Sequence, residues 1–328
     1  MTTLAIDALN VTFSTEDGPL HALKNVSFEV PENRIVGIVG ESGCGKSTLI
    51  NAILGLLADN GAIDSGRILY QGREDLTSLA PARMRDLRGP QIATVFQDPM
   101  GALNPVISVG QQMINIQYRT NLPKADKVKR AAAMLELVRI PDARDALARY
   151  PHQFSGGMKQ RIAIAMALMM EPALLIADEP TTALDATLEV TTIELLKDLQ
   201  QQIGCSVMFI SHHLGVIAEL CDDVVVMYAG EVVERGSTRQ IFNDPRHPYT
   251  ARLLECDPAR QVSRTRNLPT IPGEIPNLRA RPAGCIFASR CHRVHDACNR
   301  PTPDKQVGDG HVARCFVADT PVAAEVPA

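Results

Sequence analysis

The sequence predicts an α/β fold in which helices cover both faces of a parallel sheet. Short apolar runs rich in β-branched residues alternate with stretches of helical character. One early run leads into a glycine-rich turn that opens a helix. A third observation indicates a smaller second part of irregular structure: residues 1–255 hold 13 of the 22 prolines, and residues 256–328 hold the other nine.

The predicted elements follow one another along the chain. Residues Leu4–Phe13 and Ser27–Val30 alternate apolar and polar side chains with period two, as antiparallel strands do. A helix is expected at Lys46–Leu57, and the amphipathic stretch Lys124–Val138 predicts a helical insertion over about residues 98–158. Further strands are expected at Arg34–Gly40, Ile92–Phe96, Ala173–Ala177, Ser206–Ile210, Val224–Tyr228 and Glu231–Glu234.

Composition excludes several classes of protein. The chain has 328 residues, a net charge of −4, no tryptophan and 4% aromatic residues, which argues against a surface for nucleic acid. The longest apolar run, Ile162–Met170, is far shorter than the ~20 residues that cross a bilayer. The first ten residues lack the basic and apolar regions of a secretory signal. We expect a soluble, cytosolic protein.

The segment Gly40–Ser47 (GESGCGKS) fits the pattern G-x-x-x-x-G-K-[ST], follows a strand and opens a helix. Glycines let successive backbone N–H groups turn inward, and with the helix N-terminus they form a cradle for phosphates. Lys46 is expected to contact the β- and γ-phosphates, and the Ser47 hydroxyl to bind Mg²⁺. The alternative is a glycine-rich turn that binds nothing. The residues expected around the nucleotide are Gly40, Glu41, Ser42, Gly43, Cys44, Gly45, Lys46, Ser47 and Thr48.

Two carboxylates follow the buried strand at Ala173–Ala177. The carboxyl end of a parallel strand is where ligands bind in α/β proteins. We expect Asp178 to hold Mg²⁺, directly or through water, and Glu179 to act as general base on the attacking water. The alternative is a pair of solvated acids that begin a turn before Pro180.

A third motif, Phe154–Arg161 (FSGGMKQR), lies between these two. Together the three motifs resemble the nucleotide-binding subunit of ATP-binding cassette (ABC) transporters. The resemblance implies a RecA-like P-loop NTPase core with an antiparallel β subdomain and a helical insertion. It also implies a dimer in which each ATP lies between the phosphate loop of one subunit and Ser155, Gly156 and Gly157 of the other, whose helix N-terminus offers donors to the γ-phosphate.

Other positions match the family one by one. Gln97 resembles the glutamine that contacts Mg²⁺ or water. Asp185, in the segment Ala183–Asp185, resembles the aspartate that communicates across the dimer. His212 resembles the switch histidine that contacts the γ-phosphate. Phe13 lies where an aromatic ring stacks on adenine, or it belongs to the core.

Two positions depart from the family pattern. Met158 replaces a glutamine in the signature, which leaves the donors to the γ-phosphate in place. The residue after the switch histidine is His213 where the family often has aspartate, and an exchange of roles between the two histidines stays open.

The C-terminal stretch narrows the family. The segments His247–Thr250, Ile271–Gly273, Gly284–Phe287 and Arg290–Cys291 resemble the extension of dipeptide and oligopeptide importer ATPases. The resemblance implies an ATP-hydrolysing motor, on the cytoplasmic face of the inner membrane, for uptake of di- or oligopeptides or related small solutes. Its implied partners are transmembrane permease subunits, a second ATP-binding subunit and, indirectly, an extracytoplasmic solute-binding protein. We expect a nucleotide-binding domain over residues 1–240 and an extension over residues 241–328.

Four of the eight cysteines are spaced C-x5-C-x6-C-x16-C near the C-terminus. Four thiolates from one irregular segment suit zinc or an iron–sulfur cluster. Gaps of five and six residues fit short zinc knuckles poorly, and the resemblance implies a 4Fe–4S cluster; zinc, free thiols and disulfides stay open. His292 and His295 lie within the same spacing, as substitute ligands or, more often for such histidines, as solvated side chains. The four cysteines are Cys285, Cys291, Cys298 and Cys315, and those expected to be small buried hydrophobes are Cys205, Cys221 and Cys256.

Two other functions compete with transport. One is a non-transport ABC ATPase of DNA repair or translation. The interval from Ser47 to Ser155 carries no sustained heptads, and the chain holds one cassette, which argues against both kinds. The other is an iron–sulfur-sensing regulatory ATPase, which the cysteines alone favour.

Overall fold

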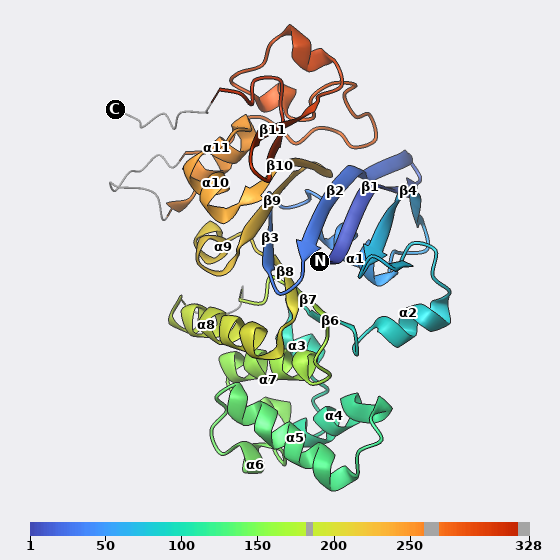
Figure 1. The fold of residues 1–328 in the computed structure, drawn as a ribbon, viewed down its shortest axis with the longest axis vertical. Helices are drawn as coiled ribbons and strands as arrows, with labels where there is room; N and C mark the ends of the chain where they lie inside the picture. The colour runs from blue at the N-terminus through green and yellow to red at the C-terminus, as the bar shows by residue number, and fades with distance from the viewer. Residues whose placement is uncertain (182–185, 259–268, 321–328) are drawn as a thin grey trace. The chain divides into compact units, whose positions relative to one another are not determined.

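The computed structural model describes residues 1–181, 186–258 and 269–320 (Figure 1). The chain forms two compact units. Unit 1 comprises Met1–Val30, Ile35–Leu79 and Ser211–Ala328, and unit 2 comprises Pro31–Arg34 and Ala80–Ile210. Within the described ranges, no helix is long and apolar enough to cross a membrane.

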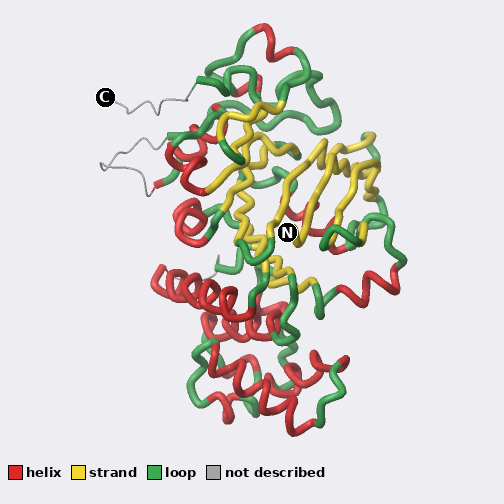
Figure 2. Tube along the Cα trace, viewed as in Figure 1, coloured by secondary structure: helices red, strands yellow, loops and turns green. Residues whose placement is uncertain are grey.

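An antiparallel sheet opens unit 1, with strand order β2-β1-β4-β5 (Figure 2). The period-two alternation correctly predicts β1 and β2, but both strands are longer than expected because a two-residue turn joins them directly. Apolar side chains of β1 such as Leu4 and Leu9 face the core. The strands are β1 (Thr2–Thr15), β2 (Gly18–Pro31), β4 (Gly61–Tyr70) and β5 (Glu74–Asp75).

A second sheet in unit 1 is mixed, with order β11-β12-β10-β9-β3. Strands β3 and β9 are parallel, and the other pairs are antiparallel. The predicted parallel pairing therefore holds for β3 and β9 and is wrong for the other pairs of this sheet. The turn Ala229–Gly230 between β9 and β10 has φ values of 46° and 82°, the backbone of a tight hairpin. The strands are β3 (Ile35–Val39), β9 (Asp223–Tyr228), β10 (Glu231–Ser237), β11 (Asp304–Gly308) and β12 (His311–Arg314).

Helices α9, α10 and α11 of unit 1 contact this mixed sheet. Helix α1 ends three residues before the predicted Leu57, because Gly55 adopts the left-handed conformation that closes a helix. Helix α9 contacts β3 closely: a Cβ on Gly37 would lie 2.9 Å from the Cys221 sulfur. The helices are α1 (Lys46–Leu54), α9 (Leu214–Leu220), α10 (Thr238–Asn243) and α11 (Pro248–Glu255).

Unit 2 contains three parallel strands in the order β8-β7-β6. These are the continuous apolar runs of the sequence, and nearly all their residues are buried, as a parallel strand covered on both faces requires. The predicted bounds agree with the structure to within one residue. The strands are β6 (Ile92–Val95), β7 (Leu174–Asp178) and β8 (Ser206–Ile210).

Helices make up the rest of unit 2. Helices α3 to α6 lie within the predicted insertion at residues 98–158, and α7 lies beside α8 (Figure 1). Helix α2 is not predicted, because it is short and buries only Met84 and Leu87. The helices are α2 (Pro81–Leu87), α3 (Pro99–Ala102), α4 (Val109–Ile116), α5 (Lys124–Leu137), α6 (Ala143–Ala146), α7 (Gly156–Leu168) and α8 (Ala186–Ile203), with 3-10 turns η1 (Gln117–Arg119) and η2 (Pro151–Gln153).

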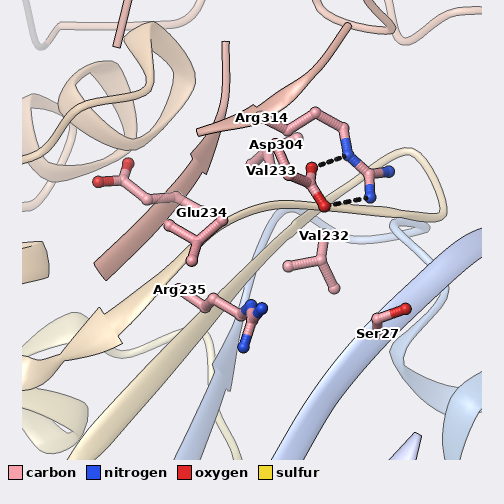
Figure 3. Close-up of a pocket in the computed structure, with 8 residues that line it drawn as sticks. Ser27, Val232, Val233, Glu234, Arg235, Asp304 and Arg314 are labelled. Atoms are coloured by element: carbon pink, nitrogen blue, oxygen red, sulfur yellow. Dashed lines mark hydrogen bonds and ion pairs between the residues drawn. The ribbon is translucent and has the colours of Figure 1, made fainter. Parts of the chain in front are cut away.

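The C-terminal stretch is not wholly irregular, which corrects the prediction. Besides the 3-10 turns η4 (Ala288–Arg290) and η5 (Asp296–Asn299), it contributes the hairpin β11–β12, which extends the mixed sheet from β10. Nε of Arg314 on β12 donates a hydrogen bond to Oδ1 of Asp304 on β11 at 2.7 Å. Both residues line a small hollow beside β10 (Figure 3). The hairpin is therefore part of the sheet.

A buried carboxylate attaches the C-terminal stretch to β10. The Glu234 side chain is fully buried and accepts hydrogen bonds from the backbone N–H groups of Arg246 and His247, at 2.7 and 2.9 Å. It also pairs with Nε2 of His311 at 2.7 Å. One side chain thus joins β10, the start of α11 and β12.

His247 caps α11 and predicts an acid-sensitive stability. Its Nδ1 accepts the Tyr249 N–H at 3.0 Å, which requires a neutral ring, and burial, with a smaller effect of Arg314, lowers its pKa to about 3. The unfolded chain therefore binds a proton that the folded chain excludes between about pH 6.5 and pH 3, so stability falls as the pH falls through that window. From pH 7.5 to pH 5 this group alone costs about 2 kcal/mol.

The variant His247→Asn keeps a capping acceptor without the titrating ring. Urea unfolding at the two pH values is expected to show a smaller loss of stability for the variant than for the wild type. An equal loss in both proteins would refute the assignment to His247.

Candidate functional site

The predicted nucleotide-site residues come from both units of the chain. In unit 1, the phosphate loop joins β3 to α1. Gly40 has φ +154°, and a Cβ there would lie 2.1 Å from the Met227 carbonyl oxygen, so no other residue fits. Gly45, with φ +103°, is similarly confined by Leu23, at 2.8 Å from such a Cβ. The glycines of the motif are therefore required by the shape of the loop.

Lys46 folds back over the loop. Its Nζ donates to the carbonyl oxygens of Gly40 and Glu41, at 2.7 and 3.1 Å, and lies 3.6 Å from the Cys44 sulfur. The side chain is 9% exposed. Cys44 is a buried loop residue, and burial raises the pKa of its thiol. The ammonium group thus lies inside the turn of the loop.

The first turn of α1 presents backbone donors at the loop. The first helical hydrogen bond runs from the Leu49 N–H to the Gly45 carbonyl, at 2.9 Å. The amides of Lys46, Ser47 and Thr48 therefore lie at the open end of the helix, where anions bind. The Ser47 side chain is exposed there, as a metal-binding hydroxyl must be.

Glu41 has partners that sequence reasoning missed. Its N–H donates to the Tyr249 hydroxyl at 2.9 Å, and its carboxylate binds the Arg290 guanidinium at 2.7 and 3.2 Å. Both partners lie in segments that were singled out only for their resemblance to importer ATPases. The C-terminal stretch therefore contacts the phosphate loop directly.

Two more predicted residues lie in unit 1. His212 and His213 are both exposed, and their rings meet edge to face with centroids 4.3 Å apart. The Phe13 ring is half-buried and lies against Gly61 of β4, where a Cβ would come within 2.5 Å of it.

In unit 2, the acidic strand end and Gln97 come together. Glu179 directly follows β7, and its Oε2 accepts a hydrogen bond from Nε2 of Gln97 at 3.0 Å. Gln97 follows β6, which pairs with β7, so the two side chains share one edge of the parallel strands. Asp178, the last residue of β7, lies opposite Ile210 of β8.

The backbone of Glu179 is unusual. Its φ is +45°, a left-handed conformation that costs a non-glycine residue of order 1 kcal/mol or more. The Glu179 N–H donates to the Ile210 carbonyl at 2.9 Å, which holds this turn in place. Such strain is common where a reactive side chain must be fixed.

The signature begins α7. Ser155 is the N-cap, and its Oγ accepts the Met158 N–H at 3.3 Å. Ser155 and Gly156 are exposed, whereas Gly157 is buried, and a Cβ on it would lie 3.1 Å from Leu188 of α8. The exposed helix start can face another molecule. Asp185 and its neighbours Ala183 and Leu184 lie outside the described residues.

The four C-terminal cysteines gather in one place without forming a metal site. Burial, and then the neighbouring thiols, raise the pKa of Cys285 to about 11, and the Cys285 N–H donates to the Cys298 carbonyl at 2.8 Å. Burial also raises the pKa of the Cys291 and Cys315 thiols. In the described part of the chain, however, no three His, Cys, Asp or Glu side chains are placed to hold a metal ion. The donor type suits a cluster, but the predicted metal-cluster domain is not seen.

The remaining cysteines are packing residues. Cys205 and Cys221 are buried, as predicted, and burial raises the pKa of both. Cys256 is only partly buried, which corrects that prediction: it ends α11, at the edge of the packed region.

Comparison with solved structures identifies the class. A dimeric ATP-binding cassette in a post-hydrolysis state with ADP and phosphate matches with a TM-score of 0.63 and 28% identity, covering 72% of this chain and 99% of that one. A cassette from Clostridium perfringens, part of an ABC transporter complex, matches with a TM-score of 0.65 and 31% identity, covering 74% and 90%. The chain is an ABC-type ATPase cassette.

Sequence comparison places it within that class. The ABC transporter family model matches residues 23–182, and the model of the C-terminal region of oligopeptide/dipeptide transporters matches residues 233–298. The dipeptide transport ATP-binding protein of Bacillus subtilis is 44% identical over 96% of this chain and 95% of its own length. The oligopeptide transport ATP-binding protein of Salmonella typhimurium is 43% identical over 95% and 93%. The chain thus belongs to the ABC transporter ATP-binding subunits of the oligopeptide/dipeptide type, which confirms the predicted family and ATPase activity.

Proposed function

We propose that the protein is the motor subunit of an importer that couples ATP hydrolysis to uptake of di- or oligopeptides. The observation that carries this is the full-length similarity to dipeptide and oligopeptide transport ATP-binding proteins, C-terminal region included. Its partners are transmembrane permease subunits, and a solute-binding protein acts indirectly. The subunit works at the cytoplasmic face of the inner membrane.

Transport by the native complex in liposomes tests this proposal. Labelled di- and tripeptides, supplied with the solute-binding protein, are expected to accumulate in an ATP-dependent manner. Nickel and oligosaccharides serve as comparison solutes. ATP-dependent uptake of either of these without uptake of peptide would refute the peptide assignment and leave the motor function standing.

We propose the following roles in the ATPase cycle. Lys46 and the amides at the start of α1 bind the phosphates, Ser47 and Asp178 hold Mg²⁺, and Glu179 activates the attacking water. Gln97 contacts the metal or the water beside Glu179, with which it shares a hydrogen bond. In these roles no covalent intermediate forms on the protein.

The remaining roles concern the γ-phosphate, the base and the second cassette. His212 contacts the γ-phosphate, Phe13 stacks on adenine, and Asp185 communicates across the dimer. Ser155 and Gly156 bind the ATP held by the second cassette, which is identical or homologous. Two findings support this arrangement: both residues are exposed at a helix start, and a similar cassette is dimeric.

We also propose a division of the chain into a nucleotide-binding domain, residues 1–240, and an extension, residues 241–328. The separate match of a C-terminal region model to residues 233–298 supports it. Limited proteolysis of the full-length chain, followed by mass analysis of the fragments, tests where the extension begins.

We further propose that Cys285, Cys291, Cys298 and Cys315 bind a 4Fe–4S cluster. Their thiols lie close enough to raise one another's pKa, and a bound metal displaces thiol protons. Full-length protein purified without oxygen is expected to be brown, to absorb broadly near ~400 nm and to contain about four iron atoms per chain. Cys298→Ser is expected to lose iron, whereas Cys205→Ser keeps it. Stoichiometric zinc, or neither metal, would refute the cluster.

A further inference from the structure

Arg290 of the C-terminal stretch binds the phosphate loop through Glu41. Its Nη1 lies 2.7 Å from Oε2 of Glu41 and its Nη2 lies 3.2 Å from Oε1, a two-pronged pair. The arginine side chain is only 5% exposed, so solvent screens this pair far less than a surface ion pair. Arg290 ends the turn η4 and is the residue before Cys291.

The guanidinium is fixed from its other sides as well. Its Nε donates to the Pro272 carbonyl at 3.0 Å, and Nη2 donates to the Ile271 carbonyl at 2.9 Å. Nη1 also donates to the Tyr228 hydroxyl at 3.2 Å. The bonds to Glu41 in particular raise the pKa of Arg290, so the charge is always present. Only a planar guanidinium makes this set of bonds; a lysine cannot.

A second contact holds the backbone of the same loop residue. The Tyr249 hydroxyl accepts the Glu41 N–H at 2.9 Å, and its ring packs on Tyr228 and Phe287 at centroid distances of 4.6 and 5.4 Å. Phe287 is fully buried and lies between Cys285 and Arg290 in the sequence. The Glu41 carbonyl binds Nζ of Lys46. The N–H, the carbonyl and the carboxylate of Glu41 therefore all have partners, two of them from the C-terminal stretch.

We propose that Arg290 is a positioning residue for ATP binding: it holds Glu41 so that the phosphate loop keeps the shape that binds phosphate. The affinity for ATP thereby depends on the fold of the four-cysteine segment, residues 285–315. A loop already fixed in its bound shape loses less conformational freedom when phosphate binds. Linkage requires the reverse effect as well, so ATP must stabilise the segment. This inference needs only ATP binding and does not depend on the transported solute.

ATP affinity of the full-length chain tests the positioning role. Arg290→Ala and Glu41→Gln are each expected to raise the ATP dissociation constant about 10-fold, and the double variant no more than the worse single one. Turnover of Arg290→Ala at saturating ATP is expected to stay within about twofold of the wild type, because the arginine contacts the loop and not the reacting atoms. Arg290→Lys restores the charge without the fork and is expected to fall between Ala and wild type.

Arg314→Ala is the matched control, since Arg314 is an arginine of the same stretch, paired with Asp304 and Glu231. It is expected to lower thermal stability and to leave ATP affinity unchanged. If Arg314→Ala weakens ATP binding as much as Arg290→Ala does, the cause is a general loss of structure in the C-terminal stretch, and the proposal fails. Additive effects of Arg290→Ala and Glu41→Gln would also overturn it.

Hydrogen exchange measures the reverse effect, stabilisation of the C-terminal segment by ATP, without relying on activity. Amides in residues 271–291 are expected to exchange more slowly with ATP and Mg²⁺ than without, and this protection should be lost in Arg290→Ala measured at saturating ATP. Equal exchange in both conditions in the wild type would refute the coupling. If Arg290→Ala fails to fold, Arg290→Lys is the second test: wild-type ATP affinity in folded Arg290→Lys would overturn the role of the guanidinium.

Discussion

Glu179→Gln is expected to lower ATP hydrolysis about 100-fold or more while leaving ATP binding intact. The amide has the size of the carboxylate, so the left-handed backbone at this position and the hydrogen bond to Gln97 can persist. It cannot take a proton from water, which is the role assigned to Glu179. Phosphate release at saturating ATP and Mg²⁺ measures the first effect, and a fluorescent ATP analogue measures the second.

Glu171→Gln is the matched control for this experiment. Glu171 belongs to the same unit, is 66% exposed and pairs with Arg130, so its substitution is expected to change turnover less than twofold. Wild-type turnover in Glu179→Gln would remove Glu179 from the mechanism. Loss of ATP binding in that variant would instead show a structural role for its carboxylate.

The strands of the core could be predicted because their signal is local. Ser206–Ile210 and Leu174–Asp178 are short, continuous apolar runs, and burial on both faces accounts for that pattern. The hairpin β11–β12 carries no such signal: its strands are polar or short, and its pairing depends on β10 and the buried Glu234, far away in the sequence. Non-local pairing of this kind is not visible in a window of residues.

The difference between local and non-local signals also separates the site residues that the sequence predicts from those that it does not. The phosphate loop is a local motif whose glycines are required by contacts such as that of Gly40 with Met227. Arg290 and Glu41 are 249 residues apart, and neither has an unusual neighbourhood in the sequence. The clustered cysteines were the visible signal that the C-terminal stretch matters, but their spacing alone does not determine where the four sulfur atoms lie. Among the residues that the structure describes, no three His, Cys, Asp or Glu side chains are placed to hold a metal ion.

Lys46→Ala is expected to weaken ATP binding about 100-fold, because the charged hydrogen bonds from the ammonium group to phosphate are lost. The ammonium group is nearly buried and holds the carbonyls of Gly40 and Glu41, so alanine removes both a phosphate ligand and a contact that shapes the loop. Lys46→Met keeps the length and apolar stem of the side chain without its charge. We expect it to fold about as stably as the wild type, because removal of a buried charge offsets the lost bonds to the two carbonyls, and to bind ATP about as weakly as Lys46→Ala.

Titration with a fluorescent ATP analogue, together with thermal unfolding, measures both effects. Lys24→Ala serves as control, since Lys24 is exposed in the same unit, and it is expected to bind ATP like the wild type. Lys46→Met and Glu179→Gln then separate the two halves of the reaction: the first lacks binding and therefore turnover, and the second binds without turning over. If Lys46→Met bound ATP with wild-type affinity, the amides at the start of α1 would supply the phosphate contacts by themselves, and the role assigned to the Lys46 charge would be wrong.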